Sequence, residues 1–176
     1  MDIVYKSNIS FIMKNSYDVI ICGGGLTGSL MALALADYGI KTALVDMLVL
    51  KNDKKKPFDG RAYALSLTST RMLSSLGLWK SVEKNSTPIL DIKVSAGYAG
   101  TGAFPFYMHF GHKETNDGPM GYMIEDRFLR NALNQELTKN PFINHFCPRK
   151  IINQNVLPGF VEVELDNLEI LRGKLL

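Results

Sequence analysis

Residues 17–46 read YDVIICGGGLTGSLMALALADYGIKTALVD, and this stretch decides the fold. Residues 17–22 are rich in β-branched side chains and predict a buried strand, and residues 41–46 predict a second one. Between them, a glycine cluster precedes an Ala- and Leu-rich segment, residues 26–38, which predicts a helix that ends at Gly39 in a left-handed cap. This order predicts a βαβ unit with adjacent parallel strands and a right-handed crossover.

The same stretch contains an uncharged run of 18 residues, 19–36, which is near the minimum length of a transmembrane helix. Glycines at positions 23, 24, 25 and 28 divide this run into a β-branched half and a helix-forming half. A strand, a turn and a helix therefore describe the run better than one membrane span does.

The glycines Gly23, Gly25 and Gly28 fit the pattern G-x-G-x-x-G, with Leu26 and Thr27 inside it. In a dinucleotide-binding turn, the first glycine permits the tight turn and the second lets the backbone approach a pyrophosphate. The third lets the helix pack closely on the strand, and the N–H groups at the helix start face the pyrophosphate.

An acidic residue, Asp46, stands at the end of the second predicted strand, eighteen positions beyond Gly28. At this offset a carboxylate accepts hydrogen bonds from both hydroxyls of an adenosine ribose. A βα turn that merely needs glycines is the alternative. Because the strand, the helix start and the acid are all present, we expect dinucleotide binding.

Composition excludes several classes of protein. The chain has 176 residues, 46% of them apolar, and a formal net charge of +3, which is typical of one globular domain. Its one basic run, residues 51–56, is predicted to be a solvated loop, so we expect no nucleic-acid partner. Cys22 and Cys147 are too few for a disulfide framework, and a reduced, cytoplasmic protein is expected.

Beyond the βαβ unit, the chain alternates short strands with two helices. The second strand feeds a long polar loop rather than further closely spaced βα units, which suits a flavin fold with inserted segments better than an NAD domain. The predicted strands are residues 61–66, 89–98, 101–110, 121–125, 142–147, 150–154, 160–165 and 168–176, and the predicted helices are residues 67–76 and 126–138.

Three further stretches of sequence carry a family resemblance. Residues 59–66 read DGRAYALS and residues 76–79 read LGLW, which resembles the D-x-R-x-x-A-L-S … L-G-x-W segment of class A flavin aromatic hydroxylases. Residues 121–127 read GYMIEDR and resemble the G-Y-x-x-E-N-R segment of the ubiquinone-biosynthesis (Ubi-type) members. Asp126 departs from the Asn or His that is more usual there.

The resemblance implies an α/β fold of the glutathione-reductase type, in which a Rossmann-like FAD-binding βαβ unit carries an inserted, mostly antiparallel β segment. It also implies FAD as a bound cofactor, and NAD(P)H and O2 as co-substrates. The reaction would hydroxylate an aromatic ring of a prenylated quinone precursor through a flavin C4a-hydroperoxide, with the protein orienting the cofactor and excluding water. No catalytic residue is assigned.

The resemblance implies contacts with FAD for two arginines. Arg61 follows the polar loop and is expected to reach FAD phosphate oxygens with paired donors, the alternative being a surface ion pair with Asp59 or Glu83. Arg127, at the start of the predicted helix 126–138, would face the flavin or lie on solvated helix surface.

Other polar and aromatic clusters have competing interpretations. Phe104, Phe106, Tyr107 and Phe110 would line a pocket for a prenylated ring or form the core face of a sheet. The three histidines and Cys147 lack the paired spacing of a zinc site, so no metal is expected.

The resemblance also divides the chain. Residues 1–16 are expected to be an extension, 17–88 the FAD-binding βαβ unit with the following helix, 89–120 part of a substrate-domain sheet, and 121–176 a return to the FAD-binding domain. Family members are about twice as long, so the fold is expected to be incomplete at the C-terminus, before a D-G-x-x-S segment. The chain alone is therefore expected to be marginally stable and inactive as a hydroxylase.

The partner and function predictions leave several options open. The expected partner is an aromatic or prenylated quinone precursor, with peripheral membrane contact and a second polypeptide carrying the C-terminal half as further options. The alternatives to a monooxygenase are a non-catalytic dinucleotide-binding module or remnant, and an FAD- or NAD-dependent dehydrogenase.

Overall fold

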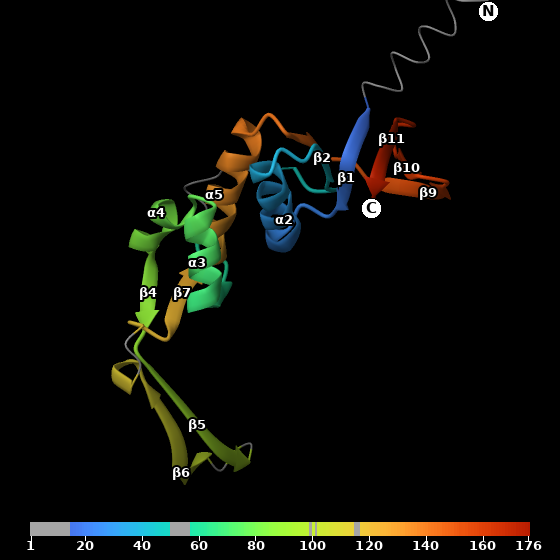
Figure 1. The fold of residues 1–176 in the computed structure, drawn as a ribbon. Helices are drawn as coiled ribbons and strands as arrows, with labels where there is room; N and C mark the ends of the chain where they lie inside the picture. The colour runs from blue at the N-terminus through green and yellow to red at the C-terminus, as the bar shows by residue number, and fades with distance from the viewer. Residues whose placement is uncertain (1–14, 50–56, 99, 101, 115–116) are drawn as a thin grey trace, which may run out of the picture. The chain divides into compact units, whose positions relative to one another are not determined.

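A computed structural model of the protein describes residues 15–49, 57–98, 100, 102–114 and 117–176 (Figure 1). The chain forms two compact units, one from residues 1–53 and 130–176 and the other from residues 54–129. The predicted extension, except for its last residues, and the basic run at 51–56 lie outside the described residues.

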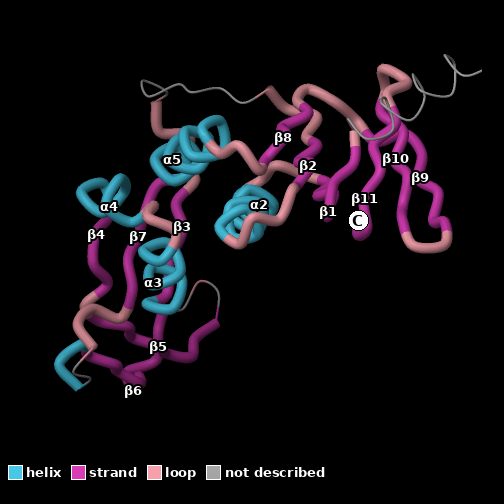
Figure 2. Tube along the Cα trace, turned by 45° about the horizontal axis from the view of Figure 1, so that its top comes forward, coloured by secondary structure: helices cyan, strands magenta, loops and turns pink. Residues whose placement is uncertain are grey.

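The first unit contains a six-stranded sheet with the order β8-β2-β1-β11-β10-β9, as Figure 2 shows. Strand β1 pairs in parallel with β2 on one side and with β11 on the other, and β2 pairs in parallel with β8. Strands β9 and β10 extend the sheet by antiparallel pairing. The strands are β1 (Ser16–Cys22), β2 (Thr42–Val45), β8 (Ile143–Phe146), β9 (Ile151–Leu157), β10 (Phe160–Leu165) and β11 (Ile170–Leu175). The predicted parallel pair is therefore confirmed.

Helix α2 (Leu26–Asp37) connects β1 to β2 and packs against β1, β2 and β8. Its buried residues, Ser29, Ala32, Leu33 and Ala36, are spaced so that they form one face. The helix ends as predicted at Gly39, which has a φ of +73°. The Gly39 N–H donates to the Ala36 carbonyl at 2.9 Å, and the next N–H donates to the Leu35 carbonyl at 3.1 Å, so a Schellman motif closes the helix.

The core of this unit lies on the sheet, and along β10 buried residues alternate with partly buried ones. Strand β2 is buried throughout, as expected for a strand with a parallel neighbour on each side. One cluster of buried residues joins four strands of the sheet: Tyr17, Ile20, Ala43, Val45, Val161, Val163, Leu165 and Leu171.

The strands of the second unit pair only in antiparallel fashion among the described residues. Its three-stranded sheet has the order β3-β7-β4, and β5 pairs with β6 in a separate ribbon. The strands are β3 (Ala62–Ser66), β4 (Ser86–Ile89), β5 (Asp91–Tyr98), β6 (Gly102–Gly111) and β7 (Gly121–Glu125), and the helices are α3 (Leu67–Ser75), α4 (Trp79–Val82) and the start of α5 (Asp126–Lys139).

Two details of this unit correct the sequence analysis. The predicted strand 89–98 is two strands, because Ser86–Ile89 pairs with β7 whereas Asp91–Tyr98 pairs with β6. The four aromatic residues of β6 do not form the core face of a sheet. Their exposed fractions run from 44% for Phe110 to 89% for Phe106, because the two-stranded ribbon has no layer over it among the described residues.

Candidate functional site

The glycine loop, residues 23–25, joins β1 to α2 at the carboxyl end of the sheet's parallel strands. Gly23 has a φ of +105°, a conformation that side chains rarely adopt, and its N–H donates to the Val45 carbonyl at 2.8 Å. The Ser29 hydroxyl donates to the Gly24 carbonyl at 3.0 Å from inside the helix. These contacts fix the loop to β2 and to α2.

The start of α2 is arranged as an anion site would be. A Cβ on Gly28 would lie 1.9 Å from the Gly23 carbonyl oxygen, so this glycine allows helix and loop to touch. The N–H groups of Leu26, Thr27 and Gly28 belong to the first turn, where no intrahelical acceptor exists. No side chain of the described residues caps this end, and a Cβ on Gly25 would have none of their atoms within 4 Å. The N–H donors of the first turn of α2 therefore lie next to open space, as they do in an anion-binding site.

Asp46 follows β2, and its carboxylate turns toward the glycine loop. Its Oδ2 accepts from the Gly24 N–H at 2.5 Å, and its Oδ1 accepts from the Leu48 N–H at 2.6 Å. The Asp46 backbone is held by the end of β8, because its N–H donates to the Phe146 carbonyl at 3.0 Å. The Asp46 carboxylate thus holds the glycine loop in place, a structural role that the sequence did not indicate. A carboxylate has about four acceptor positions, so capacity remains for a ribose.

His145 lies in β8 close to this acid. Both ring nitrogens are buried, and neither has a hydrogen-bond partner among the described residues. Burial lowers the pKa of His145, and the negative charge of Asp46 opposes that shift without cancelling it. The imidazole is therefore neutral at neutral pH.

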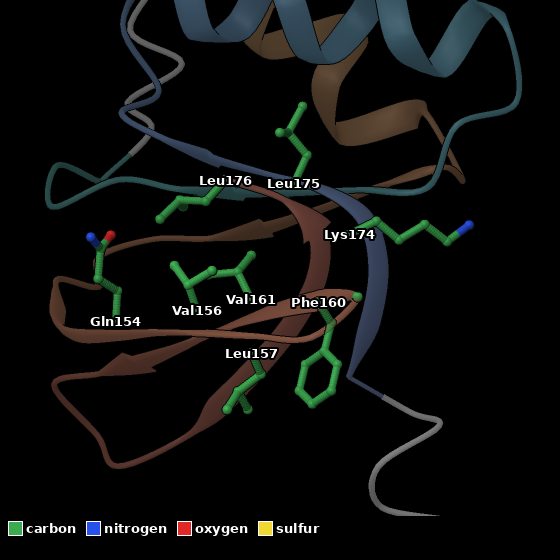
Figure 3. A pocket seen from close by; sticks show the side chains of 9 residues that line it. Gln154, Val156, Leu157, Phe160, Val161, Lys174, Leu175 and Leu176 are labelled. Carbon is green, nitrogen blue, oxygen red and sulfur yellow. The ribbon is translucent and has the colours of Figure 1, made fainter.

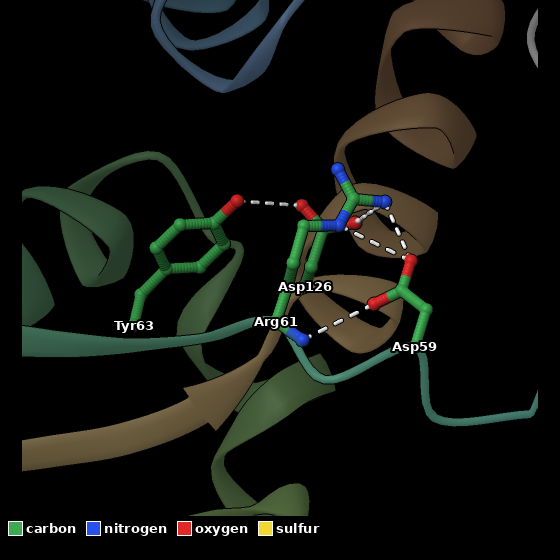
Figure 4. Close-up of polar contacts among 4 residues, drawn as sticks. All are labelled: Asp59, Arg61, Tyr63 and Asp126. Carbon is green, nitrogen blue, oxygen red and sulfur yellow. Dashed lines mark hydrogen bonds and ion pairs between the residues drawn. The ribbon is translucent and has the colours of Figure 1, made fainter.

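In the second unit, Arg61 lies beside two carboxylates (Figure 4). The Asp59 Oδ2 accepts from the Arg61 Nη2 at 2.6 Å and from its Nε at 3.1 Å. The Asp126 Oδ2 lies 3.4 Å from the same Nη2. The hydrogen bond to Asp59 and then the charge of Asp126 raise the pKa of Arg61. Among the described residues, the ion pair given as the alternative is thus present with Asp59, and Asp126 is a second partner.

Asp126 is the residue of this cluster that the sequence analysis did not assign. It is the first residue of α5 and is 3% exposed. Its Oδ1 accepts from the Tyr63 hydroxyl at 2.9 Å, and its backbone N–H donates to the Arg61 carbonyl at 3.0 Å. The departure from the family's usual residue at this position was the only sequence signal.

Arg127, the next residue, is held locally. Its Nε donates to the Glu125 carboxylate at 2.6 Å, and its guanidinium lies 4.7 Å from the centre of the Phe128 ring. The structure therefore brings Gly23, Gly25, Leu26, Thr27, Gly28 and Asp46 together in the first unit, and places Arg61 and Arg127 in the second. The flavin contacts of both arginines stay predictions.

An open groove of about 510 Å³ lies elsewhere on the first unit, over β9, β10 and the end of β11 (Figure 3). Its lining is mostly apolar and includes Val156, Phe160 and Val161, with Lys174 at one side. None of the predicted site residues lines it.

Comparison with known proteins defines the class. The family described as "FAD binding domain" matches residues 16–141, which is most of the chain. The chain therefore belongs to this FAD-binding family, and the predicted resemblance to class A flavin monooxygenases of the Ubi type is confirmed at the family level.

Individual relatives carry more specific names than the family does. Ubiquinone hydroxylase UbiL of Rhodospirillum rubrum is 37% identical over 134 residues, covering 76% of this chain and 30% of the relative. The 3-demethoxyubiquinol 3-hydroxylase of Escherichia coli is 27% identical over 165 residues, covering 90% of this chain and 39% of the relative. The chain thus spans 30% to 39% of the length of these two relatives.

Solved structures confirm the fold. The p-nitrophenol 4-monooxygenase PnpA of Pseudomonas putida superposes with a TM-score of 0.68 at 21% identity, over 91% of this chain and 39% of that one. PqsL of Pseudomonas aeruginosa, in complex with 2-aminobenzoylacetate, gives a TM-score of 0.69 at 19% identity, over 90% and 41%. At these identities the likeness concerns the fold alone.

In the described part of the chain, no helix is long and apolar enough to cross a membrane.

Proposed function

We propose that this chain is the cofactor-binding part of an FAD-dependent monooxygenase that hydroxylates the aromatic ring of a quinone precursor. The observation that carries the proposal is the glycine loop, where first-turn N–H groups meet open space beside Gly25. Family membership supports FAD as the dinucleotide. The names of the relatives support a ubiquinone precursor as the substrate class.

The residues of the chain would divide the binding of FAD between them. The backbone at Gly23, Gly25, Leu26, Thr27 and Gly28 would bind the pyrophosphate, and Asp46 would accept from the adenosine ribose. The Arg61 guanidinium would donate hydrogen bonds to a phosphate oxygen, and Arg127 would place a positive charge at the start of α5. Bound FAD would supply the oxygen chemistry, with NAD(P)H as the reductant. Peripheral membrane contact and a second polypeptide stay predictions.

The test of this function is a competition titration of the purified chain. We expect FAD to bind saturably and to be displaced by ADP but not by riboflavin, because the contacts proposed here lie on the ADP half. NAD⁺ binding more tightly than FAD would favour the dehydrogenase alternative. An FAD signal that riboflavin displaces and ADP does not would contradict the proposal.

A substitution of Asp46 tests the ribose contact. Asp46→Ala removes the acceptor of the Gly24 and Leu48 N–H groups as well as the proposed ribose acceptor. Each charge-assisted bond contributes about 1.5–3 kcal/mol, so the affinity for ADP should fall at least about tenfold. Asp46→Asn is the graded control, because it keeps one oxygen acceptor, loses the charge and puts an NH2 donor in place of the other oxygen, so its affinity should fall between those of the parent and Asp46→Ala. Equal ADP binding by Asp46→Ala and the parent in calorimetric titration would show that Asp46 has no ribose role.

A further inference from the structure

His145, in the first unit, is a titratable residue to which the proposed function gives no role. It pairs in β8 with Leu44 of β2, and Leu44 pairs with Ile21 of β1, so the three side chains form one row on one face of the sheet. That face is the α2 side, since the Ile21 side chain lies 3.3 Å from the position of a Cβ on Gly28. The His145 imidazole therefore lies on the α2 side of the sheet, and α2 contacts β8.

Both ring nitrogens of His145 are buried without a hydrogen-bond partner among the described residues. A neutral imidazole is tolerated in such a place at a modest cost in free energy. An imidazolium would bring a charge and two N–H donors to the same place, which is much more unfavourable. Protonation of His145 therefore favours any rearrangement that brings an anion to the ring.

Asp46 is the anion that acts on His145. Burial lowers the pKa of His145, and among the described residues the negative charge of Asp46 raises it in opposition. Strand β2 itself has no charged residue. The other charged residues on the segments of this unit that adjoin β8 are Asp37 of α2, Arg130, Glu136 and Lys139 of α5, and Arg149 and Lys150 after β8.

The Asp46 carboxylate is within reach of the His145 ring. Asp46 stands two positions beyond Leu44, and its N–H donates to the Phe146 carbonyl, so it continues the pairing of β2 with β8 on the same face as His145. A rise of about 3.3 Å per residue and a strand spacing of about 4.8 Å put the two Cα atoms about 8 Å apart, which the two side chains can span. In the structure, two backbone N–H groups hold the carboxylate instead, at 2.5 Å and 2.6 Å.

We propose that His145 makes the adenosine site sensitive to pH. When the imidazole takes up a proton from solvent, the Asp46 carboxylate turns from the Gly24 N–H to the imidazolium. The glycine loop then loses one of its contacts and the ribose loses its acceptor, so a dinucleotide binds more weakly at acidic pH. This inference rests on the proposed function, in which Asp46 accepts from the adenosine ribose.

The direction of the effect follows from linkage. Because burial lowers the pKa of His145, the neutral form prevails above about pH 6.5 and the protonated form appears only as the pH falls further. Bound FAD keeps Asp46 at the ribose and thereby opposes protonation of His145. The affinity for FAD must therefore fall as the pH is lowered through the pKa of His145.

FAD titrations of the full chain at about pH 7.5 and about pH 5.0 measure this effect, because the pyrophosphate of FAD keeps its charge over that range. We expect the parent to bind FAD about threefold more weakly, or worse, at the lower pH. His145→Leu takes up no proton and removes two unpartnered buried nitrogens, so it should fold and should lose this response. His109→Gln is the matched control, because it removes a histidine of the second unit that is 42% exposed, and it should keep the response of the parent.

A second readout follows the proton on His145 itself. The chain has three histidines, so the signal of His145 in proton–carbon NMR spectra is identified by its absence from His145→Leu. We expect the pKa of His145 to fall when FAD is added. It should also fall in Asp46→Asn, because this variant removes the negative charge that raises it.

The outcomes separate this inference from the proposed function. Equal FAD affinity of the parent at both pH values, a response that persists in His145→Leu, or a pKa of His145 that Asp46→Asn leaves unchanged overturns the inference, whereas the function stands. Unfolding of the parent before its affinity changes, followed by circular dichroism, also overturns it, because the proton then acts on the whole unit. If the parent binds no FAD at about pH 7.5, the proposed function is wrong and the inference fails with it.

Discussion

Replacing Gly28 by Ala is expected to destabilise the βαβ unit severely. The added Cβ would lie 1.9 Å from the Gly23 carbonyl oxygen and 3.1 Å from the Gly23 carbonyl carbon. Both are backbone atoms of a loop that the Val45 carbonyl and the Ser29 hydroxyl fix from two sides. The helix must therefore move away from the strand. We expect a loss of about 3 kcal/mol or more in the free energy of unfolding, the upper part of the range for overpacking.

Urea denaturation followed by circular dichroism measures this loss, with Gly25→Ala as the matched control. A Cβ on Gly25 has no described atom within 4 Å, and the backbone there, with a φ of −67°, suits any residue. Ala is a poorer N-cap than Gly, so the control should lose no more than about 1 kcal/mol. Equal stabilities of the two variants would mean that helix and loop do not touch at Gly28.

Gly25→Val is expected to have the largest effect on ligand binding while keeping the fold. The space that its side chain would fill adjoins the first-turn N–H groups of α2, where the pyrophosphate of FAD is proposed to lie. Because Val would displace the phosphate from those donors, we expect at least a tenfold loss of FAD affinity, about 1.4 kcal/mol. Substitution has different effects at the two glycines because a Cβ at Gly28 would meet backbone atoms of Gly23, whereas a Cβ at Gly25 would have no described atom within 4 Å.

Much of the first unit could be predicted because its signals are local. The β-branched run before Gly23, the alanines of the helix and Gly39 at its end each act on neighbouring residues, and all three led to the observed elements. The parallel pairing followed as well, since a short βαβ connection leaves few alternatives.

The contacts that the sequence did not predict join residues far apart in the chain. The hydrogen bond from the Tyr63 hydroxyl to the Asp126 carboxylate joins residues 63 positions apart, and no rule of sequence spacing relates these two residues. Asp46 was recognised by its position after a strand, but its bonds to the Gly24 and Leu48 N–H groups depend on how the loop folds. The exposure of the β6 aromatics was missed because alternation along a strand does not say whether a second layer covers it.

The central claim is that the glycine loop binds the pyrophosphate of FAD, and the most direct measurement is an FAD titration of the parent chain and Gly25→Val side by side. Flavin fluorescence reports the binding, and circular dichroism confirms that both chains are folded. We expect saturable binding by the parent, displaced by ADP, and at least a tenfold weaker affinity in Gly25→Val. Equal FAD affinity in two equally folded chains would contradict the claim, as would the absence of saturable FAD binding by the parent.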